Sequence, residues 1–383
     1  MKICAIICEY NPFHNGHLHH IREAKRLSGA DYIVCLMSGN FVQRGEAAIL
    51  DKYTRAKHAV FAGADVVIEL PTVYATSNAE IFAKGAIQLL SAIPAVTTLC
   101  FGAENADVSA FIRVAQLLND EPENVSALIK QLTNDGLSYA KARAEAWKGI
   151  LPADLMSSPN NILGLEYTRA ILENNANISI LPIPRLGSGY NSTDLDDEFA
   201  SATAIRQALT QNVLPDKYLP PFVLKDLPTQ TNNVMESLEK YAVLAKPASE
   251  IAQVCDCSEG LENAFKKAAL SPNSFVDELT SARYTSSRIR RIALQNLLGI
   301  KESFIRDCLA TKLYLRVLAV NADKKDVLSA IFTPNAPSIL RAYDANTLNG
   351  TAKECLGKDN FAESIYQLLN NLGKKEKNIF WTV

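Results

Sequence analysis

The 383-residue chain has no apolar run long enough to cross a membrane as a helix. Its first apolar segment, residues 3–8, is short, is followed at once by Glu9, and carries no cleavage site of small residues. We therefore expect neither a membrane span nor a secretory signal, and we expect a cytoplasmic protein. The net charge of -2 excludes a uniformly basic nucleic-acid coat, although it leaves room for a local basic patch.

The sequence also lacks the spacings typical of metal sites and of the common nucleotide-binding loops. Cys255 and Cys257 form a CxC pair, but no second pair follows at a zinc-site spacing, so we predict no structural metal. Neither the Walker pattern GxxxxGK[ST] nor the dinucleotide pattern GxGxxG follows the first apolar segment. A phosphate site at this place must therefore be of another kind.

The first half of the chain alternates strand-like and helix-like segments. Apolar runs predict buried strands over 2–8, 31–38, 64–71, 96–102 and 178–185, and amphipathic runs predict helices over 16–28, 51–63 and 78–93. Strands that are apolar throughout are typical of a parallel sheet with helices on both faces. We predict an α/β fold with a Rossmann-like doubly wound parallel sheet and ligands at the carboxyl ends of its strands.

The second half of the chain differs in pattern. After the two prolines at 220–221, strand-like runs become rare and helical patterns dominate. We therefore predict an α/β domain over residues 1–215 and a mainly helical C-terminal domain over residues 222–383.

Four of the five histidines lie in one stretch, EYNPFHNGHLHH, at residues 9–20. Here the first predicted strand passes into the first predicted helix, which is the ligand-facing edge of such a sheet. Gly16 allows close approach, and the helix that begins near it directs free N–H groups to the same point. His14 and His17 can donate hydrogen bonds to phosphate oxygens. The alternative is a set of solvated histidines, which we favour only for the two histidines that follow.

A second motif, ASATAIR, lies at residues 200–206. We predict that Ser201 and Thr203 are helix N-caps and that Arg206 follows one turn later; a phosphate site and a plain capping motif are the alternatives. FHNGH resembles the HxGH signature of the nucleotidyltransferase superfamily that also includes the class I aminoacyl-tRNA synthetases. SATAIR resembles the second motif of that superfamily, (I/S)SxTxIR. The resemblance implies that the catalytic residues are His14, His17, Thr203 and Arg206.

Six ordered segments carry a narrower resemblance: EYNPFHNGHLHH, MSGNFVQRGE, DVVIELP, FGAEN, SPNNILGLEY and SATAIR. Over most of residues 1–210 they resemble the bacterial tRNA(Met) cytidine acetate ligase family. The resemblance implies that ATP and acetate form acetyl-adenylate and pyrophosphate. It also implies that the wobble cytidine of elongator tRNA(Met) then takes the acetyl group on N4, and it implies no protein partner. Residues 1–215 would be the ATP-binding catalytic domain and residues 222–383 the tRNA-binding domain.

The positions of these motifs give the expected ATP-binding residues. The resemblance implies contacts from one continuous segment, which consists of Ile7, Cys8, Glu9, Tyr10, Asn11, Pro12, Phe13, His14, Asn15, Gly16, His17, Leu18, His19 and His20. Gly102 offers adenine or ribose a surface without a Cβ, and Arg185 suits phosphate or ribose, with a salt bridge as its alternative. Asn160 or Asn161 would hydrogen-bond adenine or ribose, with a helix N-cap as the alternative. Mg²⁺ is expected with ATP, although no carboxylate cluster is evident.

Other charged residues follow the predicted strands. Arg44 and Glu46 lie in a loop that we expect to hold acetate or to act as a lid. Lys52 and Arg55 are expected to approach the triphosphate or tRNA phosphates, and we favour ion pairing or capping for Glu69. A general base would assist transfer to cytidine, but the sequence does not choose among its candidates. These candidates are Glu9, Glu46, Glu69, Glu80 and Glu104.

The best candidate for a nucleic-acid surface is residues 281–298, SARYTSSRIRRIALQNLL. Arginines beside hydroxyls suit phosphate contacts, and a tyrosine can stack on an unpaired base. We predict tRNA contacts from Arg283, Tyr284, Arg288, Arg290 and Arg291. A solvent-facing basic helix start is the local alternative. For the whole chain, the alternatives are a small-molecule nucleotidyltransferase and a non-catalytic RNA-binding protein.

Overall fold

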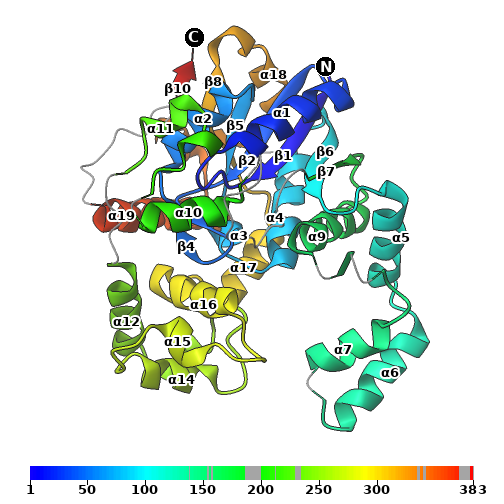
Figure 1. Cartoon of the computed structure of the whole chain (residues 1–383), viewed down its shortest axis with the longest axis vertical. Coiled ribbons are helices and arrows are strands. Elements are labelled where there is room, and N and C mark those ends of the chain that lie inside the picture. The colour runs from blue at the N-terminus through cyan, green and yellow to red at the C-terminus, as the bar shows by residue number, and fades with distance from the viewer. Residues whose placement is uncertain are drawn as a thin grey trace.

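The computed structural model describes residues 1–137, 139–152, 155–156, 158–185, 200–211, 213–228, 234–333, 337–339, 342–370 and 380–382. Within these residues, an eight-stranded sheet has the order β10-β8-β5-β2-β1-β6-β7, with β9 beside β8 (Figure 1). Its strands are β1 (Ile3–Cys8), β2 (Tyr32–Ser38), β5 (Val66–Leu70), β6 (Val96–Ala103), β7 (Ser179–Pro184), β8 (Leu315–Asn321), β9 (Ser338–Ile339) and β10 (Phe380–Thr382).

The five strands predicted from the sequence are confirmed. β1 pairs in parallel with β2 and β6, while β5 and β7 extend this parallel sheet on either side. Since β2 lies on one side of β1 and β6 on the other, the strand order reverses at β1. The crevice at the carboxyl ends of β1 and β6 is therefore where this fold type binds ligands.

Strands β8 and β10 come from beyond residue 222 and were not predicted. β8 runs antiparallel to β5, and β10 pairs in parallel with β8, so both lie in the main sheet. The sequence of β8, LRVLAVN, is a short apolar run, and periodicity alone does not distinguish such a strand from a segment of buried helix. The C-terminal part of the chain thus completes the α/β core.

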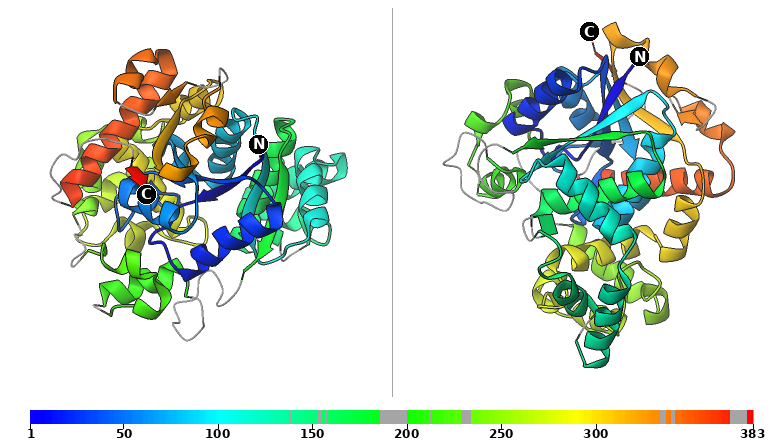
Figure 2. Two further views of the ribbon diagram at one scale, coloured as in Figure 1. Left: turned by 90° about the horizontal axis from the view of Figure 1, so that it is seen from above. Right: turned by 90° about the vertical axis from the view of Figure 1, so that its right-hand side faces the viewer.

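Helices cover both faces of the sheet, and alternate residues of β1 contribute to two separate cores. Ile3 and Ala5 join the core formed with α4 (Ala79–Ser91), α5 (Val108–Asn119), α9 (Pro159–Glu173), α17 (Glu302–Leu309) and α19 (Gly350–Leu369). Cys4 and Ile6 join the core formed with α1 (Asn15–Ser28), α2 (Lys52–Phe61) and α10 (Ala202–Thr210). The helices predicted over 16–28, 51–63 and 78–93 are confirmed. The right-hand view of Figure 2 shows the helices on the two faces of the sheet.

Two helical units extend below the sheet (Figure 1). One has its own apolar core and contains α12 (Met235–Ala245), α13 (Ala248–Ile251), α14 (Leu261–Ala268), α15 (Phe275–Leu279) and α16 (Ser286–Leu298). The other consists of α6 (Glu123–Asn134) and α7 (Tyr139–Trp147). Shorter elements are β3 (Phe41–Val42), β4 (Glu46–Ala47), α3 (Thr72–Ala75), η1 (Asp216–Tyr218), α11 (Pro221–Leu224), η2 (Ala322–Lys324), α18 (Val327–Ile331) and η3 (Ala342–Thr347). No helix of the described part is long and apolar enough to span a bilayer.

Candidate functional site

A pocket opens where β1, β6 and β7 end and where α1 and α10 begin. Most of the residues predicted to bind nucleotide line it. They are Ile7, Cys8, Glu9, Tyr10, Asn11, His14, Gly16, His17, His19, His20, Gly102, Asn160, Arg185, Thr203 and Arg206. The pocket lies at the reversal of strand order, so segments that are far apart in sequence meet at the position expected for a ligand.

His14 and His17 form a stacked pair at the start of α1. His14 is the N-cap, and its Nδ1 accepts the Gly16 N–H at 3.1 Å, while Nδ1 of His17 accepts the His14 N–H at 3.3 Å. The two ring centroids lie 3.6 Å apart. Because a neutral imidazole has one acceptor and one donor, both rings keep their hydrogen on Nε2. The pair therefore supplies two Nε2–H donors to the pocket.

This arrangement changes one expectation about the helix start. The sequence predicted a row of free amides, but the Gly16 N–H bonds to the His14 ring, and the His17 N–H bonds to the His14 carbonyl at 2.9 Å. The imidazole rings of His14 and His17 can therefore supply the hydrogen-bond donors that free amides supply in many phosphate sites. His14 as an N-cap was not predicted, because histidine is not among the residues that favour this position.

Burial keeps these histidines neutral. Burial, together with the positive charges of Arg185 and Arg206, lowers the pKa of His14 to about 3. Burial and the neighbouring His14 place the pKa of His17 well below its usual value. Burial also lowers the pKa of His20 to about 4. At neutral pH these rings act as hydrogen-bond donors and not as cations.

Acid should therefore destabilise the free protein partly through His14. Its pKa is about 6.5 in an unfolded chain and about 3 in the folded one, so only the unfolded state gains this proton as pH falls below 6.5. When the pH falls from 7.5 to 5, the free energy of unfolding should decrease in both proteins. We expect the decrease to be about 2 kcal/mol smaller in His14→Asn than in the parent. Urea unfolding at both pH values measures this difference. Equal losses in parent and variant would contradict the assignment.

Several predicted contact residues support the loop from behind. Phe13 packs its ring against Tyr10, with ring centroids 4.8 Å apart, and Leu18 contacts the adjoining apolar core. The Asn15 Nδ2 donates to the Lys217 carbonyl at 3.0 Å. Five predicted contact residues do not line the pocket, and we expect no direct ATP contact from them. They are Pro12, Phe13, Asn15, Leu18 and Asn161.

The second motif holds α10 against the first. Ser201 is the N-cap of α10, as predicted, and its Oγ accepts the Ala204 N–H at 3.0 Å. Thr203 is not a cap, because it lies in the first turn, where its Oγ1 accepts from Arg206 and Arg44 at 3.4 Å each. The Arg206 Nη1 also donates to the Asn11 carbonyl at 3.0 Å, which ties the two motifs together.

The two asparagines at the start of α9 have different roles. Asn160 lines the pocket, and its Nδ2 donates to Glu104 Oε1 at 2.7 Å. Asn161 is fully buried, and its Oδ1 accepts the N–H groups of Glu104 and Asn105, at 2.9 and 3.1 Å. The N-cap alternative is wrong for both, since Ser158 is the N-cap of α9.

A hairpin that the sequence did not assign to nucleotide binding forms one wall. Val42, Gln43, Arg44 and Glu46, from the β3–β4 hairpin, line the pocket. The turn packs directly on α16, because a Cβ at Gly45 would lie 2.5 Å from a backbone nitrogen of that helix. Two apolar lining residues, Phe82 and Tyr167, come from α4 and α9 and were also missed. No local pattern could have found them, since only the fold brings these segments together.

Comparison with known proteins identifies the family. The HIGH Nucleotidyl Transferase family model matches residues 1–379. The tRNA(Met) cytidine acetate ligase of Thermoanaerobacter sp. (strain X514) is 38% identical over 384 residues, covering 96% of this chain and 95% of that protein. The protein of the same name from Caldicellulosiruptor saccharolyticus is 40% identical over 344 residues, covering 86% and 85%. This chain belongs to the tRNA(Met) cytidine acetate ligase family.

Solved structures of this family have the same architecture. The apo crystal structure of Thermotoga maritima TmcAL has a TM-score of 0.91 to this chain at 29% sequence identity, and all of both chains is covered. The crystal structure of the same protein bound with alpha-thio ATP has a TM-score of 0.88, again over the full length of both chains. The family recognised from six sequence motifs is confirmed, and so is the predicted fold class.

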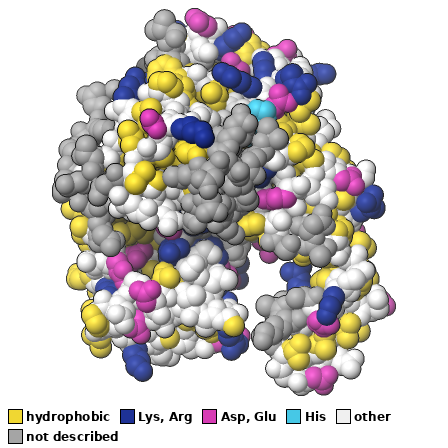
Figure 3. Space-filling view, in the orientation of Figure 1, with side chains coloured by type: hydrophobic (Ala, Val, Ile, Leu, Met, Phe, Trp, Pro, Cys, Tyr) yellow, Lys and Arg dark blue, Asp and Glu magenta, His cyan; other side chains and the backbone are white. Residues whose placement is uncertain are grey.

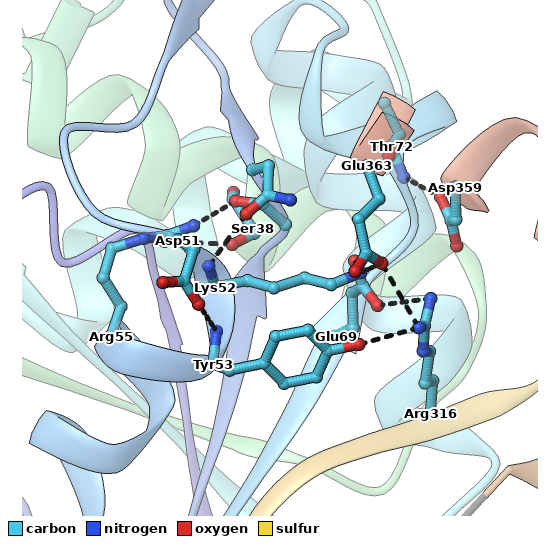
Figure 4. Close-up of polar contacts among 12 residues, drawn as sticks. Ser38, Asp51, Lys52, Tyr53, Arg55, Glu69, Thr72, Arg316, Asp359 and Glu363 are labelled. Atoms are coloured by element: carbon cyan, nitrogen blue, oxygen red, sulfur yellow. Dashed lines mark hydrogen bonds and ion pairs between the residues drawn. The ribbon is translucent and has the colours of Figure 1, made fainter. Parts of the chain in front are cut away.

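Two cations expected near the phosphates are instead buried in this member of the tRNA(Met) cytidine acetate ligase family. The Lys52 Nζ contacts Glu69 at 2.6 Å and Glu363 at 3.2 Å (Figure 4). Arg55 is fully buried and donates to the carbonyls of Glu9, Ser38, Gly39 and Leu50. The expectation for Lys52 and Arg55 is wrong, whereas ion pairing of Glu69 is confirmed. Arg55 thus fixes the ends of β1 and β2 beneath the pocket.

The predicted tRNA-contacting residues lie at the start of α16, which Thr285 caps, and are only partly free. Arg288 lies over the Tyr284 ring at 5.0 Å and donates to the Asp256 carbonyl, and the mostly buried Arg291 contacts the Asp256 carboxylate at 3.6 Å. Arg283 pairs with Glu259, and Arg290 pairs with Glu46 at 3.2 Å. Of the three arginines that form ion pairs here, Arg283 and Arg290 have more exposed side chains than Arg291.

Proposed function

We propose that this chain forms acetyl-adenylate from ATP and acetate and transfers the acetyl group to N4 of the wobble cytidine of elongator tRNA(Met). The observation that carries the proposal is the stacked His14–His17 pair, whose two Nε2–H donors line a pocket at the first strand–helix crossover. Membership of the tRNA(Met) cytidine acetate ligase family supplies the reaction. A tRNA substrate would place the protein in the cytoplasm, in line with the expectation from its sequence.

In the first step, an acetate oxygen attacks the α-phosphorus of ATP and the bond to the bridging oxygen breaks, so that pyrophosphate leaves with the electron pair. Negative charge grows on the phosphate oxygens, and the Nε2–H groups of His14 and His17 stabilise it. Arg206 and Arg44, which both donate to Thr203 Oγ1, add positive charge at the same place. Asn160 and Gly102 would adjoin the adenine or ribose, with Arg185 beside Gly102.

Mg²⁺ enters this proposal only as a companion of the ATP phosphates. In the described part of the chain, no group of three or more His, Cys, Asp and Glu residues could hold a metal ion. The pocket carboxylate of Glu46 is paired with Arg290, and that of Glu9 accepts a backbone N–H. The residues present therefore do not fit a protein-held metal, and no step is assigned to one.

The direct test supplies the protein with ATP, labelled acetate and bulk tRNA. Label that appears in tRNA as N4-acetylcytidine supports the proposal. Pyrophosphate release that depends on neither acetate nor tRNA would instead indicate a small-molecule nucleotidyltransferase. Binding of tRNA without ATP turnover would indicate a non-catalytic RNA-binding protein.

For the RNA surface, we propose that Arg283, Tyr284, Arg288 and Arg290 face tRNA, with Arg291 holding the helix start in place through Asp256. Figure 3 shows basic side chains on both helical units and an open space between the units below the sheet. Such a space suits a stem-loop, whose unpaired bases can stack on an aromatic ring. The Arg288 guanidinium over the Tyr284 ring holds that tyrosine in position.

Removing one exposed arginine should weaken tRNA binding in a salt-dependent way. For Arg283→Ala we expect a lower affinity and a slope of log K against log salt that is shallower by about 1, because one phosphate contact is lost. Fluorescence anisotropy with a tRNA(Met) transcript at several salt concentrations measures both. The matched control is Arg26→Ala, which removes an exposed arginine on α1. An Arg283→Ala slope equal to that of the parent would contradict the assignment.

A further inference from the structure

The structure separates the five carboxylates that the sequence left as possible general bases. Glu69 is buried in ion pairs with Lys52 and Arg316, and Glu80 pairs with Lys84 on α4. Glu104 accepts from Asn160 and from the backbone of Asn161. None of the three carboxylates lines the pocket. Among the described lining residues, only two carboxylates are left, and they are those of Glu9 and Glu46.

Glu46 is poorly suited to accept a proton. Its Oε1 lies 3.2 Å from the Arg290 Nη1, and its Oε2 lies 3.9 Å from the Arg206 Nη2. Each oxygen of this carboxylate thus already faces a guanidinium group, so neither is open to a proton from the substrate. Its position fits a role in linking α16 to α10.

Glu9 differs from Glu46 in that no guanidinium group forms an ion pair with its carboxylate among the described residues. Glu9 directly follows β1 and lines the pocket. Its Oε1 accepts the Gln43 N–H at 2.8 Å. No described residue donates to its Oε2, so one oxygen is anchored while the other remains available. Burial raises the pKa of Glu9, although the charges of Arg206, Arg55 and Arg44 oppose this effect. A carboxylate with a raised pKa is a stronger base than an exposed one.

The position of Glu9 also relates it to the RNA side of the pocket. Gln43, whose N–H binds the Glu9 carboxylate, lies in the turn of the β3–β4 hairpin. Gly45 lies in the same turn and packs on the backbone of Arg290 and Arg291 in α16. The Glu9 carboxylate is thus linked through the hairpin turn to the helix that is proposed to face tRNA. A cytidine that approached from the side of α16 would meet this carboxylate beside the bound acetyl-adenylate.

We propose that the free carboxylate oxygen of Glu9 is the general base that accepts the N4 proton when cytidine attacks acetyl-adenylate. The inference rests on the proposed function. The N4 lone pair forms the new C–N bond, and the carbonyl electron pair moves to oxygen while the N4 proton passes to Glu9. The carbonyl then re-forms, the bond from carbon to the phosphate oxygen breaks, and AMP leaves as an anion. Glu9 returns its proton to water, so the products are acetylcytidine, AMP and one proton.

The test separates the two half-reactions in Glu9→Gln. Glutamine keeps an oxygen for the Gln43 N–H but does not accept a proton. Adenylate formation is measured as acetate-dependent exchange between ATP and pyrophosphate. Transfer is measured in a single turnover with tRNA(Met) and preformed acetyl-adenylate. We expect the rate of transfer to fall by about 10²–10⁴-fold. The fold-loss in transfer should exceed the fold-loss in exchange by a factor of at least about 30. The control is Glu80→Gln, which removes a carboxylate outside the pocket.

A pH profile adds a readout that a structural role would not change. Transfer by the parent should rise with pH as Glu9 loses its proton, and Glu9→Gln should lose this rising limb. The charged groups that act on Glu9 are Arg206, Arg55 and Arg44. Equal losses of exchange and transfer, or unchanged transfer, would overturn the role of Glu9. A parent protein that does not acetylate tRNA from acetyl-adenylate would instead overturn the proposed function.

Discussion

His17→Ala should reduce acetate-dependent exchange between ATP and pyrophosphate by about 10²–10³-fold, the range found when one preorganised donor to a developing charge is removed. The substitution removes an Nε2–H donor from the pocket and leaves the His14 N–H without its acceptor at 3.3 Å. It also removes the ring that stacks on His14 at 3.6 Å. Both effects act on the turn that is proposed to face the phosphates and not on the proposed RNA surface of α16. Affinity for tRNA should therefore remain close to that of the parent.

The matched control for this variant is Arg22→Ala, an exposed position on the same helix. Exchange by the control should stay near the parent rate, and the urea midpoints of both variants show whether the fold is intact. If His17→Ala exchanged pyrophosphate within about threefold of the parent, the ring would have no part in stabilising the transferred phosphate.

Lys52→Met should lower the free energy of unfolding by about 3–5 kcal/mol, because it leaves buried carboxylates without their counter-charge. Lys52, Arg316, Glu69 and Glu363 form a cluster that joins α2, β5, β8 and α19 (Figure 4). The side chains of Lys52 and Glu69 are only 1% and 2% exposed, so water cannot replace the lost partner. The Arg316 Nη2 also donates to the Tyr53 hydroxyl at 3.1 Å, which extends the cluster.

Urea unfolding at pH 7 measures this loss, and a surface ion pair provides its control. Lys84 contacts Glu80 at 2.9 Å with 31% of its side chain exposed. Lys84→Met should therefore change stability by no more than about 1 kcal/mol. Similar small losses in both variants would mean that the buried cluster tolerates an unpaired carboxylate.

The cluster ties strand β8 and helix α19 to the core that the first half of the chain forms. Arg316 lies on β8 and Glu363 on α19, and together they meet the Lys52–Glu69 pair beside the ends of β2 and β5. The Asp359 Oδ1 accepts the Thr72 N–H at 2.7 Å, which links α19 to α3, the helix that follows β5. The last part of the chain thus holds the segments that carry Arg55 and the end of β1.

Local sequence patterns were enough to predict the turn from β1 into α1 that brings two histidines to the pocket. HxGH places two histidines one helical turn apart at the end of a buried strand, and the structure stacks those rings as the spacing allows. The five strands of the first half of the chain were equally predictable, because each is a mostly apolar run. β8 is also apolar, but its partner β5 lies about 250 residues earlier in the chain, and pairing over that separation leaves no local signal.

Burial of charged residues was the main source of error. Lys52 and Arg55 were predicted to approach phosphates from a basic helix. Both side chains are instead buried against β5 and the ends of β1 and β2. Their partners Glu363 and Gly39 come from unrelated segments. The role of Gln43 was hidden for the same reason, since its contribution to Glu9 is a backbone N–H that any residue carries.

The proposed function requires a nucleoside triphosphate to lie against the His14–His17 pair. The most direct measurement is a crystal structure of this protein with an ATP analogue that resists cleavage at the α-phosphate. We predict phosphate oxygens within hydrogen-bond distance of both Nε2 atoms and of Arg206, with the base near Gly102 and Asn160. A triphosphate bound elsewhere, or a pocket that stays empty while the analogue binds in solution, would contradict it.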